Sequence, residues 1–411
     1  MTAQDAMLKF RNPYRPGAGH APPYLAGRKE ETEEFKRLLD QDPVLENVVL
    51  TGLRGVGKTV LLDAFKPVAI ASGWMWVGTD LSESTSLTEE NIATRLIADL
   101  AVVTSVMPVG TARKSTVGFG TESKDVPITL NFDALVALYR ETPGLISDKL
   151  KRVLEVVWER MPKDKHRGII FAYDEAQNLA DHAEGKQFPL SMLLDVFQSI
   201  QRKGVRFMLL LTGLPTLFPK LVEARTYAER MFRVVFLRKL AEGECHEAIL
   251  RPIHDAKCPV KFSETSVTTI TQYSGGYPYF IQYLCRETFD VFLQKQSEGQ
   301  PSPSVPVMDI LRKLDTNFFA GRWARATDRQ RELLWVIAHL PNCDNEFTVQ
   351  EVVERAKELL EKPFSSSHVN QMLASLTDAG LIYKGRHGKY SFAVPLFGQF
   401  IMRQPSVQWV Q

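Results

Sequence analysis

The sequence predicts an α/β protein with a five-stranded parallel sheet, followed by a helical domain and a C-terminal domain of three helices and a hairpin. Short apolar runs alternate with helical patterns as far as Leu237, and that alternation is typical of a parallel sheet. A glycine-rich loop lies between the first apolar run and the helical pattern that follows it. From Glu242 to Gln296 the patterns are helical, so the five strands of the sheet belong to one domain.

The expected strands are short and are separated by helices or loops. A helix with capping pattern Ser86-Leu87-Thr88-Glu89 is expected from Leu87 to Val103, and an irregular segment, Thr111 to Asn131, is expected to be a hairpin insertion or a mobile loop. The five strands are predicted at Val48 to Leu50, Trp74 to Val77, Ile169 to Tyr173, Phe207 to Leu211, and Val234 to Leu237.

Composition and charge exclude several classes of protein. The 411 residues are 44% apolar and 24% charged, which argues against a wholly disordered chain. The formal net charge is only +2, so no global basic field indicates nucleic acid or an anionic membrane. The four cysteines form no CxxC pair, and no apolar run approaches the length of a membrane span. We therefore expect a soluble, cytoplasmic protein with no membrane partner.

The glycine-rich loop matches the phosphate-binding pattern GxxxxGK[ST]. Glycines allow backbone N–H groups to turn toward phosphate oxygens at a helix N-terminus. Lys58 would neutralise phosphate charge, and the Thr59 hydroxyl would bind Mg²⁺. The predicted nucleotide-binding residues of this P-loop are Gly52, Leu53, Arg54, Gly55, Val56, Gly57, Lys58, Thr59 and Val60.

A second apolar strand ends in two carboxylates, which a site for ATP hydrolysis requires. Asp174 and Glu175 follow the run Ile170 to Tyr173. Asp174 would hold the Mg²⁺ ion, and Glu175 would orient or deprotonate the attacking water. With the P-loop, this pair predicts an Mg²⁺-dependent ATP hydrolase that binds ATP and ADP.

These motifs resemble those of the AAA+ ATPases, in particular the initiator-like clade of origin-recognition and helicase-loading proteins, with the related STAND and transposition-regulator ATPases. Asp174-Glu175-Ala176-Gln177 resembles the DEAQ form of the Walker B motif. The resemblance implies that Leu25 and Arg28 lie beside the adenine, that Thr212 is the sensor-1 residue, and that Pro278 of the lid contacts the nucleotide.

The resemblance also implies an arginine finger and a departure from the initiator pattern. Arg230 falls at the finger position, which implies a homo-oligomer in the ATP state; Arg225 and Arg233 are its competitors. Tyr279 occupies the slot in which initiators usually place a lid arginine, and Gly276-Tyr277-Pro278 resembles the STAND lid instead. This departure favours slow turnover, as in a nucleotide switch.

Four segments follow from these assignments. Residues 1–23 are rich in proline and glycine and are expected to form an extended arm, 24–238 an AAA+ core, 239–320 a helical lid, and 321–411 a winged-helix domain. The winged helix is indicated by helix caps at Thr327 and Thr348, a third helix that ends at Gly380, and a hairpin from Leu381 to Val394.

The partner of the winged helix has two interpretations. Asn370 and Gln371 on its third helix could read adenine, and Lys384, Arg386, His387 and Lys389 on the hairpin could contact phosphate. The third helix, however, presents no lysine or arginine, which leaves a protein contact open. The sequence thus predicts an ATP-dependent switch that engages duplex DNA; the alternatives are a STAND-like signalling or defence switch with a protein partner, and a DNA-transposition regulator.

Overall fold

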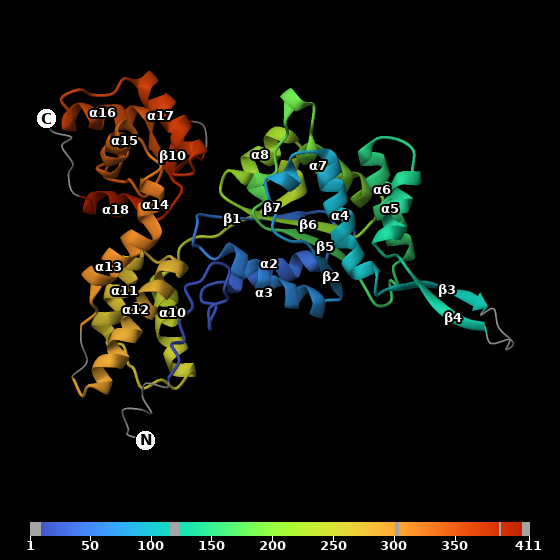
Figure 1. Ribbon diagram of the computed structural model, residues 1–411, viewed down its shortest axis with the longest axis horizontal. Helices are drawn as coiled ribbons and strands as arrows, with labels where there is room; N and C mark the ends of the chain where they lie inside the picture. The colour runs from blue at the N-terminus through green and yellow to red at the C-terminus, as the bar shows by residue number, and fades with distance from the viewer. Residues whose placement is uncertain (1–9, 116–122, 301–303, 386–387, 405–411) are drawn as a thin grey trace. The chain divides into compact units, whose positions relative to one another are not determined.

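The computed structural model describes residues 10–115, 123–300, 304–385 and 388–404, which divide into two compact units (Figure 1). The sheet unit comprises Lys29–Thr51 and Leu61–Phe236. The helical unit comprises the described residues up to Arg28, the loop Gly52–Val60, and the residues from Leu237 onward. The P-loop residues therefore belong to the helical unit, although the chain enters the loop from a strand of the sheet unit.

The sheet unit contains a five-stranded parallel sheet in the order β2-β5-β6-β1-β7. The last strand begins two residues earlier than the sequence predicts and ends before Leu237, because its ladder with β1 starts at Phe232 opposite Asn47. The strands are β1 (Asn47–Thr51), β2 (Trp74–Val77), β5 (Gly168–Tyr173), β6 (Phe207–Gly213) and β7 (Phe232–Phe236).

Alternate residues of the central strands point to opposite faces of the sheet, and both faces are covered. Ile169, Phe171 and Tyr173 of β5 join a buried cluster with residues of α4, α6 and α7. On the other face Phe35 of α2 stacks on Phe65 of α3, with ring centroids 4.1 Å apart. Figure 1 shows α2 and α3 on one side of the sheet and α4 and α7 on the other.

The helices of this unit begin where local capping permits. The helix α4 begins two residues later than the sequence predicts, because extended Thr88 is its cap and accepts a hydrogen bond from the Asn91 amide, whereas Ser86 ends a short 3₁₀ turn. The helices are α2 (Lys29–Leu39), α3 (Lys58–Ala71), η1 (Ser84–Ser86), α4 (Glu89–Thr104), α5 (Phe132–Glu141), α6 (Ile146–Arg160), η2 (Ala176–Asn178), η3 (Ala183–Gly185), α7 (Pro189–Gln201), α8 (Leu217–Ala224) and α9 (Ala228–Met231).

The irregular segment between α4 and α5 is a hairpin. Its strands β3 (Pro108–Ser115) and β4 (Ser123–Thr129) pair antiparallel, and the hairpin extends away from the sheet (Figure 1). Of the two expectations for this segment, the hairpin insertion is the one found. Gly118-Phe119-Gly120 lies outside the described residues.

The helical unit begins with four helices that enclose an aromatic cluster. Tyr14 of the N-terminal segment is only 2% exposed and stacks on Phe262. Its hydroxyl donates to the carbonyl of Ile249, so residues that the sequence predicts as an extended arm are anchored among the lid helices. These helices are α10 (Glu242–Asp255), α11 (Glu264–Ser274), α12 (Pro278–Ser297) and α13 (Val307–Leu314).

A π-helical turn, η4 (Asp315–Phe319), and a short helix, α14 (Ala320–Trp323), lead into the C-terminal part of this unit. The three predicted helices and the hairpin are present, with the predicted caps at Thr327 and Thr348, and the third helix is capped by Ser365. The elements are α15 (Asp328–Ala338), β8 (Phe347–Thr348), α16 (Val349–Leu359), α17 (Ser366–Asp378), β9 (Ile382–Lys384), β10 (Lys389–Phe392) and α18 (Phe397–Arg403), and the strands form a sheet in the order β8-β10-β9.

Within the described residues, no helix combines the length and the apolar character that a membrane crossing requires.

Candidate nucleotide-binding site

The loop between β1 and α3 has the backbone geometry that a phosphate cradle needs. Gly55 and Gly57 have φ angles of 76° and 94°, which side chains rarely tolerate. A Cβ atom added at Gly57 would meet no atom within 4 Å, whereas one at Gly55 would come within 3.1 Å of the Tyr279 Cβ. The loop is therefore packed on the lid at Gly55 and has open space at Gly57.

Lys58 places its charge inside this loop. Its Nζ donates to the carbonyl oxygens of Gly52 and Leu53, each at 3.0 Å. Because α3 begins at Lys58, the first amides of that helix and its positive dipole end adjoin the same loop. Thr59 follows on the first turn of α3. The backbone and Lys58 together suit an anion.

Two groups of the helical unit hold the loop in shape. Arg28 is 6% exposed, and its Nη2 donates to the carbonyls of Val56 at 3.0 Å and of Arg238 at 2.9 Å. From the lid, the Tyr279 amide donates to the Gly55 carbonyl at 3.1 Å. Leu25 is 36% exposed, and Pro278 is the first residue of α12. The roles of Leu25, Arg28 and Pro278 at the adenine remain predictions; the contacts of Arg28 support the P-loop.

In the sheet unit, Asp174 follows the carboxyl end of β5 and is 4% exposed. Its Oδ1 accepts a hydrogen bond from the Glu175 amide at 2.8 Å, and its carbonyl accepts from the Leu81 amide at 3.0 Å. These bonds fix the orientation of a buried carboxylate, which is what a residue in the coordination sphere of Mg²⁺ requires.

Glu175 lies in a strained turn and is held by one partner. Its φ of 51° is in the left-handed region, which is uncommon for residues other than glycine. Its Oε2 accepts a hydrogen bond from Gln177 Nε2, and Gln177 Oε1 accepts from the Leu214 amide at 3.1 Å. A Cβ at Gly213 would lie 2.7 Å from Gln177 Oε1, so that glycine makes room for the amide.

Thr212 lies in β6 beside this turn. The register pairs Tyr173 with Leu211, so Asp174 and Thr212 follow at the same edge of the sheet. The Thr212 hydroxyl is buried and has no hydrogen-bond partner within the described part of the chain, and the same holds for Thr51 at the end of β1. A buried hydroxyl without a partner is costly, and it marks this edge as one that suits a polar ligand.

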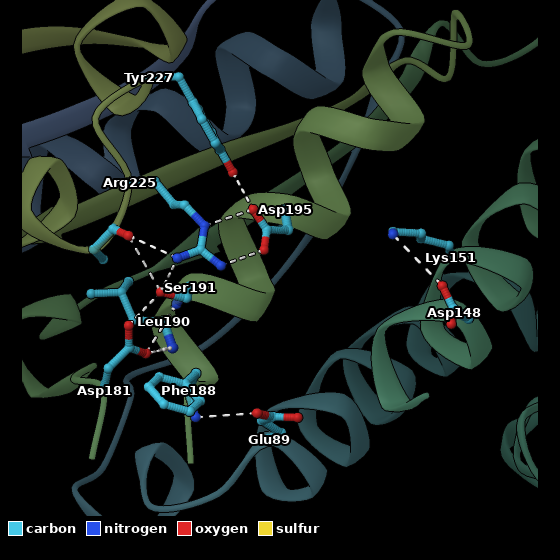
Figure 2. A network of polar contacts seen from close by, with 11 residues as sticks. Glu89, Asp148, Lys151, Asp181, Phe188, Leu190, Ser191, Asp195, Arg225 and Tyr227 are labelled. Atoms are coloured by element: carbon cyan, nitrogen blue, oxygen red, sulfur yellow. Dashed lines mark hydrogen bonds and ion pairs between the residues drawn. The ribbon is translucent and has the colours of Figure 1, made fainter. Parts of the chain in front are cut away.

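The three arginines that compete for the finger position differ in their partners. Arg225 donates to both oxygens of Asp195 and to Ser191 Oγ, and Tyr227 donates to Asp195 as well (Figure 2). Arg233 pairs with Glu34. Arg230, in contrast, is exposed, and its side chain has no ion pair or hydrogen bond to any described residue.

Topology separates Arg230 from the other predicted residues of the sheet unit. Arg230 directly precedes β7, which starts opposite Asn47 at the amino end of β1. Asp174 and Thr212 lie at the carboxyl ends of their strands, at the opposite edge of the parallel sheet. Arg230 therefore does not join them within one chain.

Four features, two in each unit, suit parts of a magnesium–nucleoside triphosphate. The open space at Gly57 and the Lys58 ammonium suit phosphates. The buried carboxylate of Asp174 and the unpartnered hydroxyl of Thr212 suit a metal-bound, polar ligand at the sheet edge. The sequence predicts each of these residues but misses Gln177 and Gly213 as the support of Glu175. The DEAQ pattern contains Gln177 and could have indicated its role. Gly213 is related to Gln177 only through the fold.

Comparison with known proteins places the fold. A family model described as a domain of unknown function, DUF8462, matches residues 316–401. No curated protein matches the sequence. The Walker-type ATPase PABY2304 of Pyrococcus abyssi is 15% identical, with a TM-score of 0.57, over 92% of this chain and 96% of that chain.

The ORC2 protein of Aeropyrum pernix, in its ADP form, is 17% identical, with a TM-score of 0.53, over 94% of this chain and 95% of that chain. The same protein in ADPNP–ADP complexes gives a TM-score of 0.52 over the same shares. At these identities the likeness is one of fold. The predicted α/β fold with its five-stranded parallel sheet is thus confirmed.

Proposed function

We propose that this protein is an Mg²⁺-dependent ATPase that acts as a slow nucleotide switch. The observation that carries the proposal is the P-loop, in which left-handed glycines leave open space and the Lys58 ammonium lies within the loop. The solved structures of similar fold include a Walker-type ATPase and an ADP-bound protein, which supports the same class of ligand.

In this proposal each residue has a distinct task. The P-loop amides and Lys58 bind the phosphates, and Mg²⁺, held by Thr59 and Asp174, supplies charge neutralisation when bound. Glu175 accepts a proton from the attacking water, and Thr212 donates to the ligand. Arg230 completes the site of a neighbouring copy, which is supported by its exposure and by its lack of a partner among the described residues. Turnover in a single copy is then slow, and assembly raises it.

The binding part is tested with a fluorescent ATP analogue and a matched pair of variants. Lys58→Ala should weaken binding at least a hundredfold, because the phosphates lose their counter-charge inside the loop. Lys66→Ala changes an exposed lysine on the same helix and should leave binding unchanged. Equal affinity of wild type and Lys58→Ala would remove the proposal.

The C-terminal domain is proposed to be a winged helix that engages duplex DNA in the ATP state. The order of three helices and a three-stranded sheet supports this, as does the exposed Lys384 at the hairpin. Arg386 and His387 lie outside the described residues. The test is the anisotropy of a labelled duplex at near-physiological salt with ATP, ADP or no nucleotide. Glu175→Gln should bind most tightly with ATP, and absence of binding in every state would contradict DNA engagement.

A second candidate, a switch with a protein partner, is favoured by the composition of α17. This helix contains no lysine or arginine. Two of its polar residues bond within the protein: Asn370, which is predicted to read adenine, donates to the Ser366 carbonyl at 2.9 Å, and Ser375 accepts from Gln330 at 2.9 Å. Salt-insensitive retention of one protein partner without DNA retention would favour this candidate.

A further inference from the structure

Three arginines gather where the P-loop meets the C-terminal part of the helical unit. Arg54 is in the P-loop, and Arg322 and Arg325 are in and just after α14. The Arg54 Nη2 lies 3.8 Å from the position that a Cβ of Gly380 would occupy, at the end of α17. The P-loop side chain thus reaches the C-terminal helices.

A row of contacts joins Arg322 to the same loop through the lid. The Arg322 guanidinium lies over the Phe318 ring, 4.4 Å from its centroid, and donates to the Phe318 carbonyl. The Phe318 ring lies 5.1 Å from that of Tyr279. Tyr279 in turn contacts Gly55, through its amide and its Cβ. Arg322 is therefore positioned on a packed aromatic support that rests on the P-loop.

The cluster lacks the counter-charge that three arginines require. None of the three pairs with a carboxylate of a described residue, whereas Arg329, a few residues further along the chain, pairs with Glu332. Burial, followed by the charges of Arg54 and Arg325, lowers the pKa of Arg322. Like charges held together without an acid are relieved by an anion, and the anion that the adjoining loop is proposed to bind is a nucleotide.

We propose that Arg322, with Arg54 and Arg325, contacts the outermost phosphate of ATP and so makes the C-terminal part of the helical unit sensitive to the difference between ATP and ADP. The inference rests on the proposed nucleotide binding. It assigns a function to residues that neither the P-loop motif nor the lid motif includes. A triphosphate adds charge that a diphosphate lacks, and arginine forms its strongest hydrogen bonds with phosphate.

The location of Arg322 gives this contact a mechanical consequence. The π-helical turn that precedes α14 contains Asp315, whose two carboxylate oxygens accept hydrogen bonds from Nε and Nη2 of Arg403 in α18. A phosphate bound by Arg322 would therefore act on a segment that is already tied to the last described helix. The bound nucleotide, ATP or ADP, would then influence the arrangement of α14 and α18.

The test compares the affinities for ATP and ADP, measured with and without Mg²⁺, in wild type, Arg322→Ala and Arg54→Ala. We expect Arg322→Ala to weaken ATP binding at least tenfold more than ADP binding, and Arg322→Lys to recover part of the difference. Arg54→Ala should change the ratio of ATP to ADP affinity in the same direction. Because the Arg54 side chain is exposed, this variant is expected to fold normally, so the test does not depend on the folding of Arg322→Ala. Arg312→Ala, at an exposed arginine paired with Asp309, is the matched control.

An unchanged ratio of ATP to ADP affinity in both Arg322→Ala and Arg54→Ala would overturn the inference. So would a loss of DNA binding in these variants without any change in that ratio, because the cluster would then serve nucleic acid. Failure of the wild type to bind either nucleotide is a separate result: it contradicts the proposed function, whereas a nucleotide-binding wild type with insensitive variants contradicts only the role of the arginine cluster.

Discussion

The segment that follows β1 and the segment that follows β5 are both suited to phosphate chemistry, but they are built in opposite ways. The P-loop depends on backbone: Gly55 and Gly57 adopt left-handed angles, and Lys58 bonds to carbonyls of the loop itself. The segment after β5 depends on side chains: Asp174 is held by an amide, and Glu175 is held by Gln177.

The difference shows which segment can be recognised from the sequence and which segment can be modified by substitution of its side-chain partners. A backbone site requires glycine at fixed spacing, so it leaves a strong motif in the sequence. A side-chain site depends on partners that approach from other strands, such as the loop after β6 that holds Gln177. Substitutions should therefore affect binding in the first segment and rate in the second.

The largest effect expected in the side-chain segment is that of Glu175→Gln. ATP affinity should stay within about threefold of wild type, because the P-loop is unchanged, whereas turnover should fall by about a hundredfold or more, because the base is lost. Single-turnover assays with a parallel binding measurement check both values. A variant that loses affinity and rate together would break the distinction between the two segments.

Arg230→Ala tests whether the side-chain segment is complete within one chain. We expect turnover to fall at least tenfold and to lose its dependence on protein concentration, because Arg230 lies at the sheet edge opposite Asp174 and acts on a neighbouring copy. Arg233→Ala, at the neighbouring arginine that pairs with Glu34, is the control. Wild-type activity in Arg230→Ala would show that the finger assignment is wrong.

Gln177→Ala sharpens the comparison by removing the support of Glu175 and leaving the base itself. Turnover should fall about tenfold with KM unchanged, because Glu175 is no longer oriented. Reduced thermal stability with normal turnover would assign Gln177 a structural role only.

The smallest effect concerns the network in Figure 2. Burial acts to raise the pKa of Asp195, but hydrogen bonds from Arg225 and Tyr227 outweigh it and lower that pKa. The stability that this carboxylate contributes is therefore present above its unfolded pKa of about 4 and is lost as pH falls through the lower, folded value. Asp195→Asn should lower the free energy of unfolding by about 1 kcal/mol at pH 7.

The measurement for Asp195 is urea unfolding at pH 7 and at pH 3. The difference between wild type and Asp195→Asn should shrink at the lower pH. Asp148→Asn is a suitable control, because its ion pair with Lys151 spans 3.8 Å at a half-exposed site (Figure 2). A difference that does not change with pH would show that the carboxylate titrates normally.

Much of the fold could be predicted because its signals are local. The apolar runs of the three central strands, β1, β5 and β6, are buried along their whole length, and the alternation of Ile169, Phe171 and Tyr173 agrees with the strand period. The caps at Thr327 and Thr348 are short-range patterns as well. The start of α4 was wrong because Ser86 and Thr88 both suit a cap, and only tertiary packing selects Thr88.

The rest depends on residues that are distant in the sequence. Nothing near Tyr14 predicts that it is buried among lid helices, since its partners Ile249 and Phe262 come much later in the chain. The contact of Arg54 with the end of α17 and the aromatic support of Arg322 are equally remote from any motif. A sequence pattern describes one segment of the chain, whereas each of these contacts joins two segments that are distant in the sequence.

The anchoring of Tyr14 also bears on the order in which the chain folds during synthesis. The hydrogen bond from Tyr14 to Ile249 spans 235 positions, so the N-terminal segment emerges from the ribosome long before its partner exists. All residues of the sheet unit, which ends at Phe236, are made in that interval. Because domains fold as units during synthesis, we expect the sheet to form before the N-terminal segment can pack against α10.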